Sequence, residues 1–351
     1  MDPASAPTSR RRLRPGIGTV ALLAAVVVSS VGLVSCQSGG GDRVTVYSGR
    51  SEQLVGTILD RFEEATGISV DVRYGDSSDL ALLITEEGDR SPADVFLSQS
   101  PGAVGFLDSK AVLAELPDSI LDRVAEQFRA ADGDWVGISG RVRVLVYNGE
   151  KVDPEELPDS VFDMTDARVA GRVGVAPTNA SFIDFVTGMR GLVGDDATLE
   201  WLEGMRDNDV RTYANNIAII DAVNRGEIDY GLVNHYYNEQ AKAEDPGVAS
   251  ENYVFPDGDV GALILVTAAG VLESSDNPAD ARRLIEYLLS EDAQQFFAEE
   301  TFEYPLAAGV EPVVADLPPI ADIEAPSLEL SSLGDRFRTT RALIEQAGLE
   351  G

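Results

Sequence analysis

The sequence predicts an α/β protein of two lobes, each built on a mainly parallel sheet with helices on both faces. Three observations support this fold class. Short segments in which apolar and polar residues alternate are typical of strands. They are interspersed with longer segments that repeat apolar residues at helical spacing. This alternation occurs in two successive sets, and 351 residues are enough for two domains with cores of their own. Late in the chain an apolar strand returns toward the first set, which implies more than one crossover between the lobes.

The first set alternates strand and helix in the order β-α-β-α-β, which predicts a parallel sheet. Gly49 lets the chain bend after the first strand, and Gly67 is a signal for the end of the first helix. Ser77 or Ser78 is expected to cap the second helix. The five elements are predicted at residues 43–50, 51–67, 68–76, 77–90 and 93–99.

The second set begins with a strand at residues 141–150 (RVRVLVYNGE) and continues through strands and helices to a C-terminal helix. Its remaining elements are a strand, turn and helix at 171–194, a helix at 196–208, a strand, loop, helix, strand and helix within 210–244, the returning strand at 261–272, a helix pair at 278–301 and a last helix at 332–348.

Each lobe is therefore expected to combine two separate stretches of chain. Lobe 1 is predicted to comprise residues 43–140 and 267–312, and lobe 2 residues 141–266 and 313–351. Sheets of this kind bind ligands in the crevice outside the carboxyl ends of their strands. We expect the binding site in the crevice between the lobes.

Composition narrows the classes of function. Hydrophobic residues make up 44% of the chain, as in a globular protein, and the formal net charge is −33. Such a chain does not neutralise phosphates, so nucleic acid is excluded as a partner. The charge fits cation binding, although it also suits an acidic surface that only keeps the protein solvated.

The N-terminal segment does not belong to the fold. Residues 1–35 combine a basic stretch (SRRRLRPG), an apolar run and a small-residue cleavage site, which together predict a secretory signal peptide. The sequence LVSC at 33–36 resembles a bacterial lipobox, in which the cysteine is lipidated and becomes the first mature residue. Residues 36–42 would then be a flexible tether. The alternative is an uncleaved transmembrane anchor, since the run is nearly long enough to span a bilayer.

Cys36 is the only cysteine of the chain, which excludes an intrachain disulfide. Its lipidation would anchor the protein to the membrane, on the extracytoplasmic face of the cell.

Two tyrosines, Tyr236 and Tyr237, stand side by side in VNHYYN, next to the only histidine, His235. In a strand their side chains would point to opposite faces. A strand that ends at Asn234 and continues as a helix removes this difficulty. Asn234 or His235 then caps the helix, and the phenols occupy its first turn, roughly 100° apart around the axis.

The first helical turn favours a phenolate over a phenol, through its free N–H groups and the helix dipole. A highly charged metal ion deprotonates its ligands, and hard ferric iron prefers anionic oxygen. The pair therefore suits ferric iron. The alternative is that one tyrosine packs in a core and the other lies at its rim.

Three strand-to-helix turns carry polar residues where helices begin. Helix N-termini bind anions through backbone N–H groups, so several of them at one crevice would hold a small oxyanion such as carbonate or phosphate. Taken singly, each turn is only a capped helix. The residues are Arg50, at the mouth of the crevice, and Ser51; Thr178, Asn179 and Ser181; and Asn215 and Asn216.

Arg141 lies where the chain passes between the lobes, and it could clamp an anion bidentately or form a surface ion pair. His235 stands alone and gives neither a metal cluster nor a nucleophilic triad, so we interpret it as structural. The sequence contains no Walker loop, dinucleotide fingerprint or cysteine-based zinc pattern.

The sequence resembles the bacterial ferric-iron-binding proteins of ABC transporters, also called bacterial transferrins. The resemblance implies a type 2 periplasmic-binding fold, iron held by paired tyrosines, a synergistic anion and an ABC permease as partner. It covers almost the whole chain after the tether, and the stretches that carry it are VTVYSGRSE, EATGISV, EEGDRSPADVFLSQ, WVGISGRVRVLVYN, VGVAPTNASF, YANNIAIIDAVNRGEIDYGLVNHYYN and EYPL.

The resemblance also implies roles for single residues. Tyr236 and Tyr237 match the metal-ligating tyrosines of the family, and Arg141 matches an arginine that recurs in its SGR stretch. The positions that match its anion contacts are Asn179, Ala180, Ser181, Asn216 and Asn234.

Two positions depart from the family pattern. The best-known members carry a histidine at the position of Ser51 and a glutamate at that of Gln99, and neither replacement is a good ferric ligand. Glu52 or a second anion oxygen would complete the coordination. Arg50, Ser51, Glu52 and Gln99 are therefore additional candidates for the crevice. A third tyrosine ligand of some members falls near Phe182.

Together these features predict a monomeric binding protein, not an enzyme. It would capture ferric iron with carbonate or phosphate and deliver it to an ABC importer, held at the membrane by the lipid on Cys36. The alternatives are a binding protein for a polyamine, thiamine or an oxyanion, a hydrolase that uses a serine with His235, and a structural lipoprotein without a ligand. The hydrolase would need a nucleophile elbow, which the sequence lacks.

Overall fold

The computed structural model describes residues 43–310, 317–326, 328 and 330–349. The predicted signal peptide, the tether and Cys36 lie outside the described residues. Within the described part of the chain, no helix is both long and apolar enough to cross a membrane.

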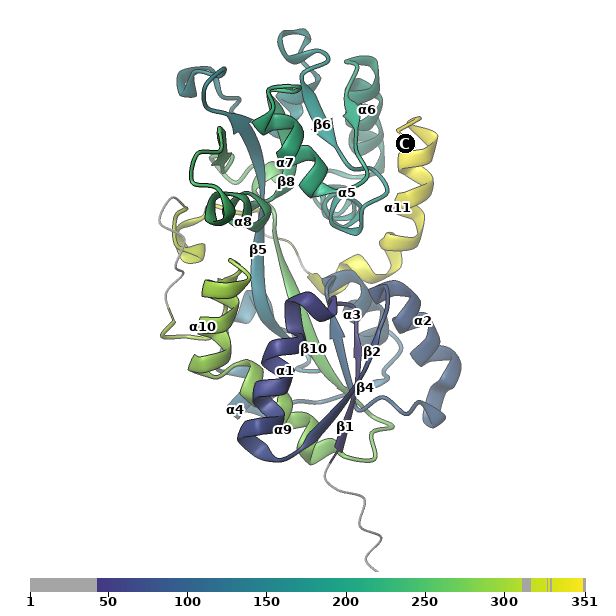
Figure 1. The fold of residues 1–351 in the computed structure, drawn as a ribbon. Helices are drawn as coiled ribbons and strands as arrows, with labels where there is room; N and C mark the ends of the chain where they lie inside the picture. The colour runs from purple at the N-terminus through teal and green to yellow at the C-terminus, as the bar shows by residue number, and fades with distance from the viewer. Residues whose placement is uncertain (1–42, 311–316, 327, 329, 350–351) are drawn as a thin grey trace, which may run out of the picture. The chain divides into compact units, whose positions relative to one another are not determined.

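An eleven-stranded sheet runs through the described residues, with β5 and β10 in its middle (Figure 1). The strands follow the order β2-β1-β3-β10-β5-β8-β6-β7. Strand β4 pairs with β10, while β9 and β11 pair with β5. The strands are β1 Arg43–Ser48, β2 Ser69–Tyr74, β3 Val95–Ser98, β4 Leu113–Ala114, β5 Val136–Asn148, β6 Val173–Val175, β7 Arg211–Thr212, β8 Tyr230–Asn234, β9 Ser250–Tyr253, β10 Ile264–Leu272 and β11 Tyr304–Pro305.

The sheet contains two parallel groups joined by antiparallel strands. Strand β1 pairs in parallel with β2 and β3, and β6 pairs in parallel with β7 and β8. Strands β10 and β5 lie between the groups and pair antiparallel with each other and with their outer neighbours. The first predicted set supplies the parallel group of β1, β2 and β3, and the second supplies β6, β7 and β8 together with the antiparallel strands β5 and β10.

Strand β5 is long and extends from one parallel group to the other, as Figure 1 shows. Residues Val136–Val142 pair with β10, and residues Arg143–Tyr147 pair with β8. The strand begins five residues before its predicted start. The prediction began too late because Gly137 and Gly140 interrupt the apolar alternation of the sequence. Gly137 is required by close packing, since a Cβ there would lie 2.7 Å from the carbonyl oxygen of Phe128.

Helices cover the sheet and bury their apolar faces on it. In α1, Val55, Ile58, Leu59 and Phe62 recur at helical spacing and are buried, and Gly67 ends the helix with φ 73° as predicted. The helices are α1 Glu52–Thr66, α2 Ser77–Glu87, α3 Pro101–Asp108, α4 Asp118–Leu121, α5 Ala180–Val193, α6 Asp195–Asp207, α7 Asn216–Asn224, α8 His235–Glu244, α9 Pro278–Leu288, α10 Glu291–Glu300 and α11 Gly334–Gln346.

The predicted cap of α2 was wrong. Asp76, not Ser77 or Ser78, is its N-cap residue, and its carboxylate accepts hydrogen bonds from the N–H groups of Ser78 and Asp79. The Ser77 hydroxyl instead accepts the N–H of Gln99 at 3.0 Å. A Cβ on Gly49 would lie 1.9 Å from that hydroxyl, so this glycine is needed for close approach.

The C-terminal helix α11 packs against α3, α5 and α6 (Figure 1). Because α3 follows β3 of the first parallel group and α5 follows β6 of the second, α11 contacts helices that belong to both groups.

Candidate functional site

The tyrosine pair sits at the start of α8, as the sequence predicts. Strand β8 ends at Asn234, whose extended backbone (φ −84°, ψ 144°) makes it the N-cap residue, and the helix begins at His235. Tyr236 and Tyr237 occupy the first turn, with ring centroids 4.3 Å apart and planes inclined by 34°. Tyr236 is buried and Tyr237 is half-buried. The two phenols therefore lie together on one side of the helix start.

Burial keeps Tyr236 a neutral phenol in the absence of a cation. Removal from water raises the pKa of its hydroxyl above the ordinary value, and the neighbouring phenol of Tyr237 raises it further. Arg50 and Arg141 act in the opposite direction, while Glu303 adds to the increase. A metal cation that replaced the phenolic proton would overcome this resistance to ionisation.

Arg141, on β5, presents buried donors that the described residues leave without partners. The side chain is 1% exposed, and its Nη2 donates to the carbonyl oxygen of Gln99 and lies 3.5 Å from Asp184 Oδ2. Its Nε and Nη1 have no hydrogen-bond partner within the described part of the chain. Because unpartnered buried donors are costly, this arrangement fits an oxyanion ligand.

A second buried arginine, Arg143, was not predicted as a site residue. It lies two residues further along β5, so both side chains leave the same face of the strand. Its Nη1 donates to Asn234 Oδ1 at 3.0 Å, and its Nη2 donates to the carbonyl oxygen of Leu232 at 2.7 Å. The alternation of arginines in GRVRV was the signal that could have identified it.

Burial lowers the pKa of Arg143 to about 9, whereas the nearby phenols of Tyr236 and Tyr237 act to raise it. Its guanidinium also lies over the ring of Phe185, 5.2 Å from the centroid. The tyrosine pair thus has two buried arginines as neighbours.

Two of the three predicted anion-binding turns, at the N-termini of α5 and α7, are in contact. Asn179 caps α5, and its Oδ1 accepts the N–H of Ser181 at 3.0 Å and the Ser181 hydroxyl at 2.7 Å. Asn216, the first residue of α7, donates from Nδ2 to Ser181 Oγ at 2.9 Å. Ala180, the first residue of α5, offers its backbone N–H at this turn.

These turns connect to the tyrosine helix through Arg143. Its Nη1 lies 3.5 Å from Ser181 Oγ and bonds Asn234, which immediately precedes α8. Asn216 Oδ1 and Asn234 Nδ2 are buried and have no partner among the described residues. The structure therefore brings Asn179, Ser181, Asn216 and Asn234 into one network, in which Asn234 Nδ2 is a free donor for an anion and Asn216 Oδ1 is a free acceptor.

Arg50 was predicted at the mouth of the crevice, but the structure buries it. It is 1% exposed, and both of its terminal nitrogens bond the carboxylate of Glu303, at 3.0 and 2.5 Å. Ser51 and Glu52, at the start of α1, are exposed, and Ser51 makes no side-chain capping bond. Gln99 is half-buried and meets Arg141 through its backbone carbonyl.

Phe182, where the resemblance placed a third tyrosine, belongs to the apolar core. Its ring packs against those of Phe185 and Trp201, with centroids 6.3 and 6.4 Å away. It is 1% exposed and offers no oxygen ligand.

His235 is structural, in agreement with its interpretation from the sequence. It is fully buried, and both ring nitrogens bond the backbone of other elements. Burial lowers its pKa to about 4, so the ring is neutral at physiological pH.

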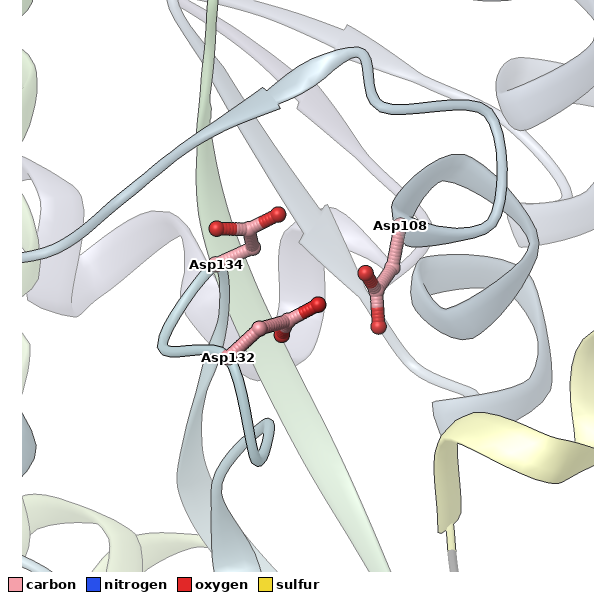
Figure 2. Close-up of side chains that lie close together, drawn as sticks. All are labelled: Asp108, Asp132 and Asp134. Atoms are coloured by element: carbon pink, nitrogen blue, oxygen red, sulfur yellow. The ribbon is translucent and has the colours of Figure 1, made fainter.

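A separate group of carboxylates lies at the end of α3 and in the turn before β5. Figure 2 shows Asp108, Asp132 and Asp134, whose carboxylates each place an oxygen within 4.8 Å of the others. Burial, then Asp132 and Asp108, raise the pKa of Asp134 to about 6. Such a group is expected on the surface of a strongly acidic protein.

Comparison with known proteins gives concordant results. Residues 90–327 match the family described as bacterial extracellular solute-binding proteins. The major ferric iron-binding protein of Neisseria meningitidis serogroup A is 36% identical over 313 residues, which cover 88% of this chain and 93% of that protein.

Two solved structures share the fold over 88% of this chain and the whole of theirs. Iron-bound HitA from Pseudomonas aeruginosa matches with a TM-score of 0.81 at 35% identity. The Trichodesmium protein IdiA (FutA), solved in complex with iron and citrate ligands, matches with a TM-score of 0.76 at 27% identity.

Proposed function

The chain belongs to the bacterial extracellular solute-binding protein family, and from this premise we propose that it captures ferric iron for import. The type 2 periplasmic-binding fold predicted from the sequence is confirmed by its structural relatives. Relatives named for ferric iron binding match nearly the whole chain, which supports the choice of cargo.

The observation that carries the proposal is the tyrosine pair at the start of α8. Two phenols with ring centroids 4.3 Å apart supply two anionic oxygens to one hard cation once they are deprotonated. Tyr236 and Tyr237 would be the iron ligands. The free N–H groups and dipole of the helix start would stabilise the phenolates.

A synergistic anion would occupy the space beside the arginines. Arg141 Nε, Arg141 Nη1 and Asn234 Nδ2 are buried donors without a partner among the described residues, and each could donate to an oxygen of the anion. Carbonate or phosphate would fit this chemistry. Asn179, Ala180, Ser181 and Asn216 would hold the anion from the helix N-termini.

Oxygens of the anion, and not Ser51 or Gln99, would complete the coordination of the iron. Ser51 is a poor ferric ligand and Gln99 engages Arg141 through its backbone, so anion oxygens are the more suitable ligands. The two buried arginines also argue against a polyamine, because their charge would repel a cationic organic ligand.

We assign the protein to the extracytoplasmic side, as a monomer that passes iron to an ABC permease. A lipid on Cys36 would tether it to the membrane. Residues 43–140 with 267–312, and 141–266 with 313–351, would form the two lobes. Their proposed borders, at Gly140/Arg141 and Val266/Thr267, lie beside each other on the β5–β10 ladder, where a hinge would allow closure over the metal.

Titration with ferric nitrilotriacetate in the presence of bicarbonate tests the proposal. The purified protein is expected to turn orange-red through tyrosinate-to-iron charge transfer, and the Tyr236→Phe, Tyr237→Phe double variant is expected to stay colourless. Full iron affinity in the double variant would defeat the assignment. Asn148→Ala, which removes a buried amide at the far end of β5, is a matched control for loss of stability.

A further inference from the structure

The only histidine of the chain is held from two sides. His235 Nδ1 accepts the backbone N–H of Val142, on β5, at 3.3 Å. His235 Nε2 lies 2.8 Å from the carbonyl oxygen of Phe302, just before β11. The first residue of α8 is thus fixed to two elements distant in sequence.

These two partners determine the tautomer of the ring. A backbone N–H only donates and a carbonyl oxygen only accepts, so Nδ1 carries no proton and Nε2 carries one. The neutral Nε2–H imidazole satisfies both bonds, and a ring flipped about χ2 satisfies neither. The orientation of the ring is therefore specified.

The ring of His235 is also part of a row of aromatic rings that ends at the tyrosine pair. Its centroid lies 4.8 Å from that of Tyr304 and 5.9 Å from that of Tyr236, which it meets edge to face at 85°. Tyr236 in turn lies against Tyr237. A displacement of the imidazole would displace Tyr236, because close-packed rings leave no free space.

The carbonyl that accepts from His235 is itself anchored. Phe302 has a left-handed backbone with φ 57°, which neighbouring contacts must hold in place. The Thr301 hydroxyl donates to Glu303 at 3.0 Å, and Glu303 is paired with Arg50 at the turn between β1 and α1. The Phe302 carbonyl therefore has a fixed position relative to the first parallel group.

We propose that His235 is a positioning residue, which sets the two phenols of the tyrosine pair against β5 and the Thr301–Tyr304 segment. This inference rests on the proposed function of Tyr236 and Tyr237 as iron ligands. His235 does not touch the metal. It acts through the first turn of α8, as groups that orient metal ligands do.

Three substitutions separate the contacts of the imidazole. His235→Asn keeps an acceptor for Val142, His235→Gln keeps a donor for Phe302, and His235→Phe keeps the ring contacts but loses both hydrogen bonds. The measurements are ferric affinity, by competition with citrate, and the wavelength of the tyrosinate-to-iron band. His235→Phe is expected to bind iron about 10- to 100-fold more weakly with a shifted band, and the amide variants are expected to fall between.

The wild-type protein and Asn148→Ala serve as controls. Asn148→Ala loses a hydrogen bond to the carbonyl of Val223 and is expected to melt at a lower temperature with an unchanged band. A colourless wild-type protein would refute the proposed function itself. A coloured wild type, with unaltered band and affinity in the folded His235 variants, would overturn the positioning role alone. If His235→Phe does not fold, the Asn and Gln variants decide.

Discussion

The carboxylate of Glu303 binds both terminal nitrogens of Arg50, although 253 residues separate them in the chain. Both side chains are inaccessible to solvent. The pair ties the turn after β1 to the segment that also bonds His235, and it lies close enough to Tyr236 to influence the ionisation of the phenol.

Glu303→Ala is expected to destabilise the protein strongly. The substitution leaves the Arg50 guanidinium buried and uncompensated, which costs about 3–5 kcal/mol in comparable pairs. Urea denaturation of the iron-free protein measures this effect. The Arg50→Met, Glu303→Leu double variant is the control, because removal of both charges is expected to restore much of the loss. Equal stability of Glu303→Ala and the wild type would show that the pair contributes nothing.

Arg141→Lys is expected to uncouple iron binding from the anion. A lysine ammonium lacks the separate, fixed Nε and Nη1 donors that Arg141 offers while its Nη2 bonds the Gln99 carbonyl. Iron affinity is expected to fall roughly tenfold at saturating bicarbonate. Without bicarbonate, the variant and the wild type should differ much less. Titrations over a range of bicarbonate concentrations check this, and an unchanged dependence would exclude Arg141 as the anion holder.

Phe182→Tyr tests whether the position of the absent third tyrosine is available to the metal. The new hydroxyl would enter an aromatic cluster with Phe185 and Trp201, where an unsatisfied polar group costs about 1–3 kcal/mol. We expect lower stability in thermal unfolding and an unchanged tyrosinate-to-iron spectrum. A stronger or shifted band would mean that the side chain reaches the iron.

Asp134→Asn is expected to change the pH dependence of stability. Because the folded protein raises the pKa of Asp134 from 3.8 to about 6, the folded state binds this proton more tightly than the unfolded state does. The stability contributed by that proton is present below pH 4 and is lost as the pH rises through about 6. The variant should therefore be more stable than the wild type at pH 7 and similar to it near pH 4.

Denaturation at several pH values measures this difference. Asp122→Asn, whose partner is Arg129 and not another carboxylate, is a suitable control for the removal of one acidic charge. A constant difference between the Asp134 variant and the wild type across the pH range would contradict the assignment.

The sequence pattern correctly predicted features that depend on neighbouring residues, such as the start of α8 and the end of α1. The switch from strand to helix at Asn234 followed from the need to bring two adjacent phenols to one side, and the structure has the helix start there. The end of α1 at Gly67 was equally readable, because glycine adopts the left-handed backbone without strain.

The errors lie where partners are far apart in sequence. From its neighbours in the sequence, Arg50 is predicted to be an exposed residue at a turn. Nothing near it in the chain indicates that it will be buried and paired with Glu303. The cap of α2 was misassigned because Asp76 and the serines after it are all good caps, and Ser77 is engaged by Gln99 from another strand-helix turn. Arg143 is the exception, since its alternation with Arg141 was visible in the sequence.

A crystal structure of the iron-loaded protein, with the metal located by anomalous scattering at the iron edge, would show whether the tyrosine pair holds the iron. We expect a single strong peak within bonding distance of the phenolic oxygens of Tyr236 and Tyr237, with an oxyanion between the metal and Arg141. A peak at Asp108, Asp132 and Asp134 with none at the tyrosines would contradict this expectation.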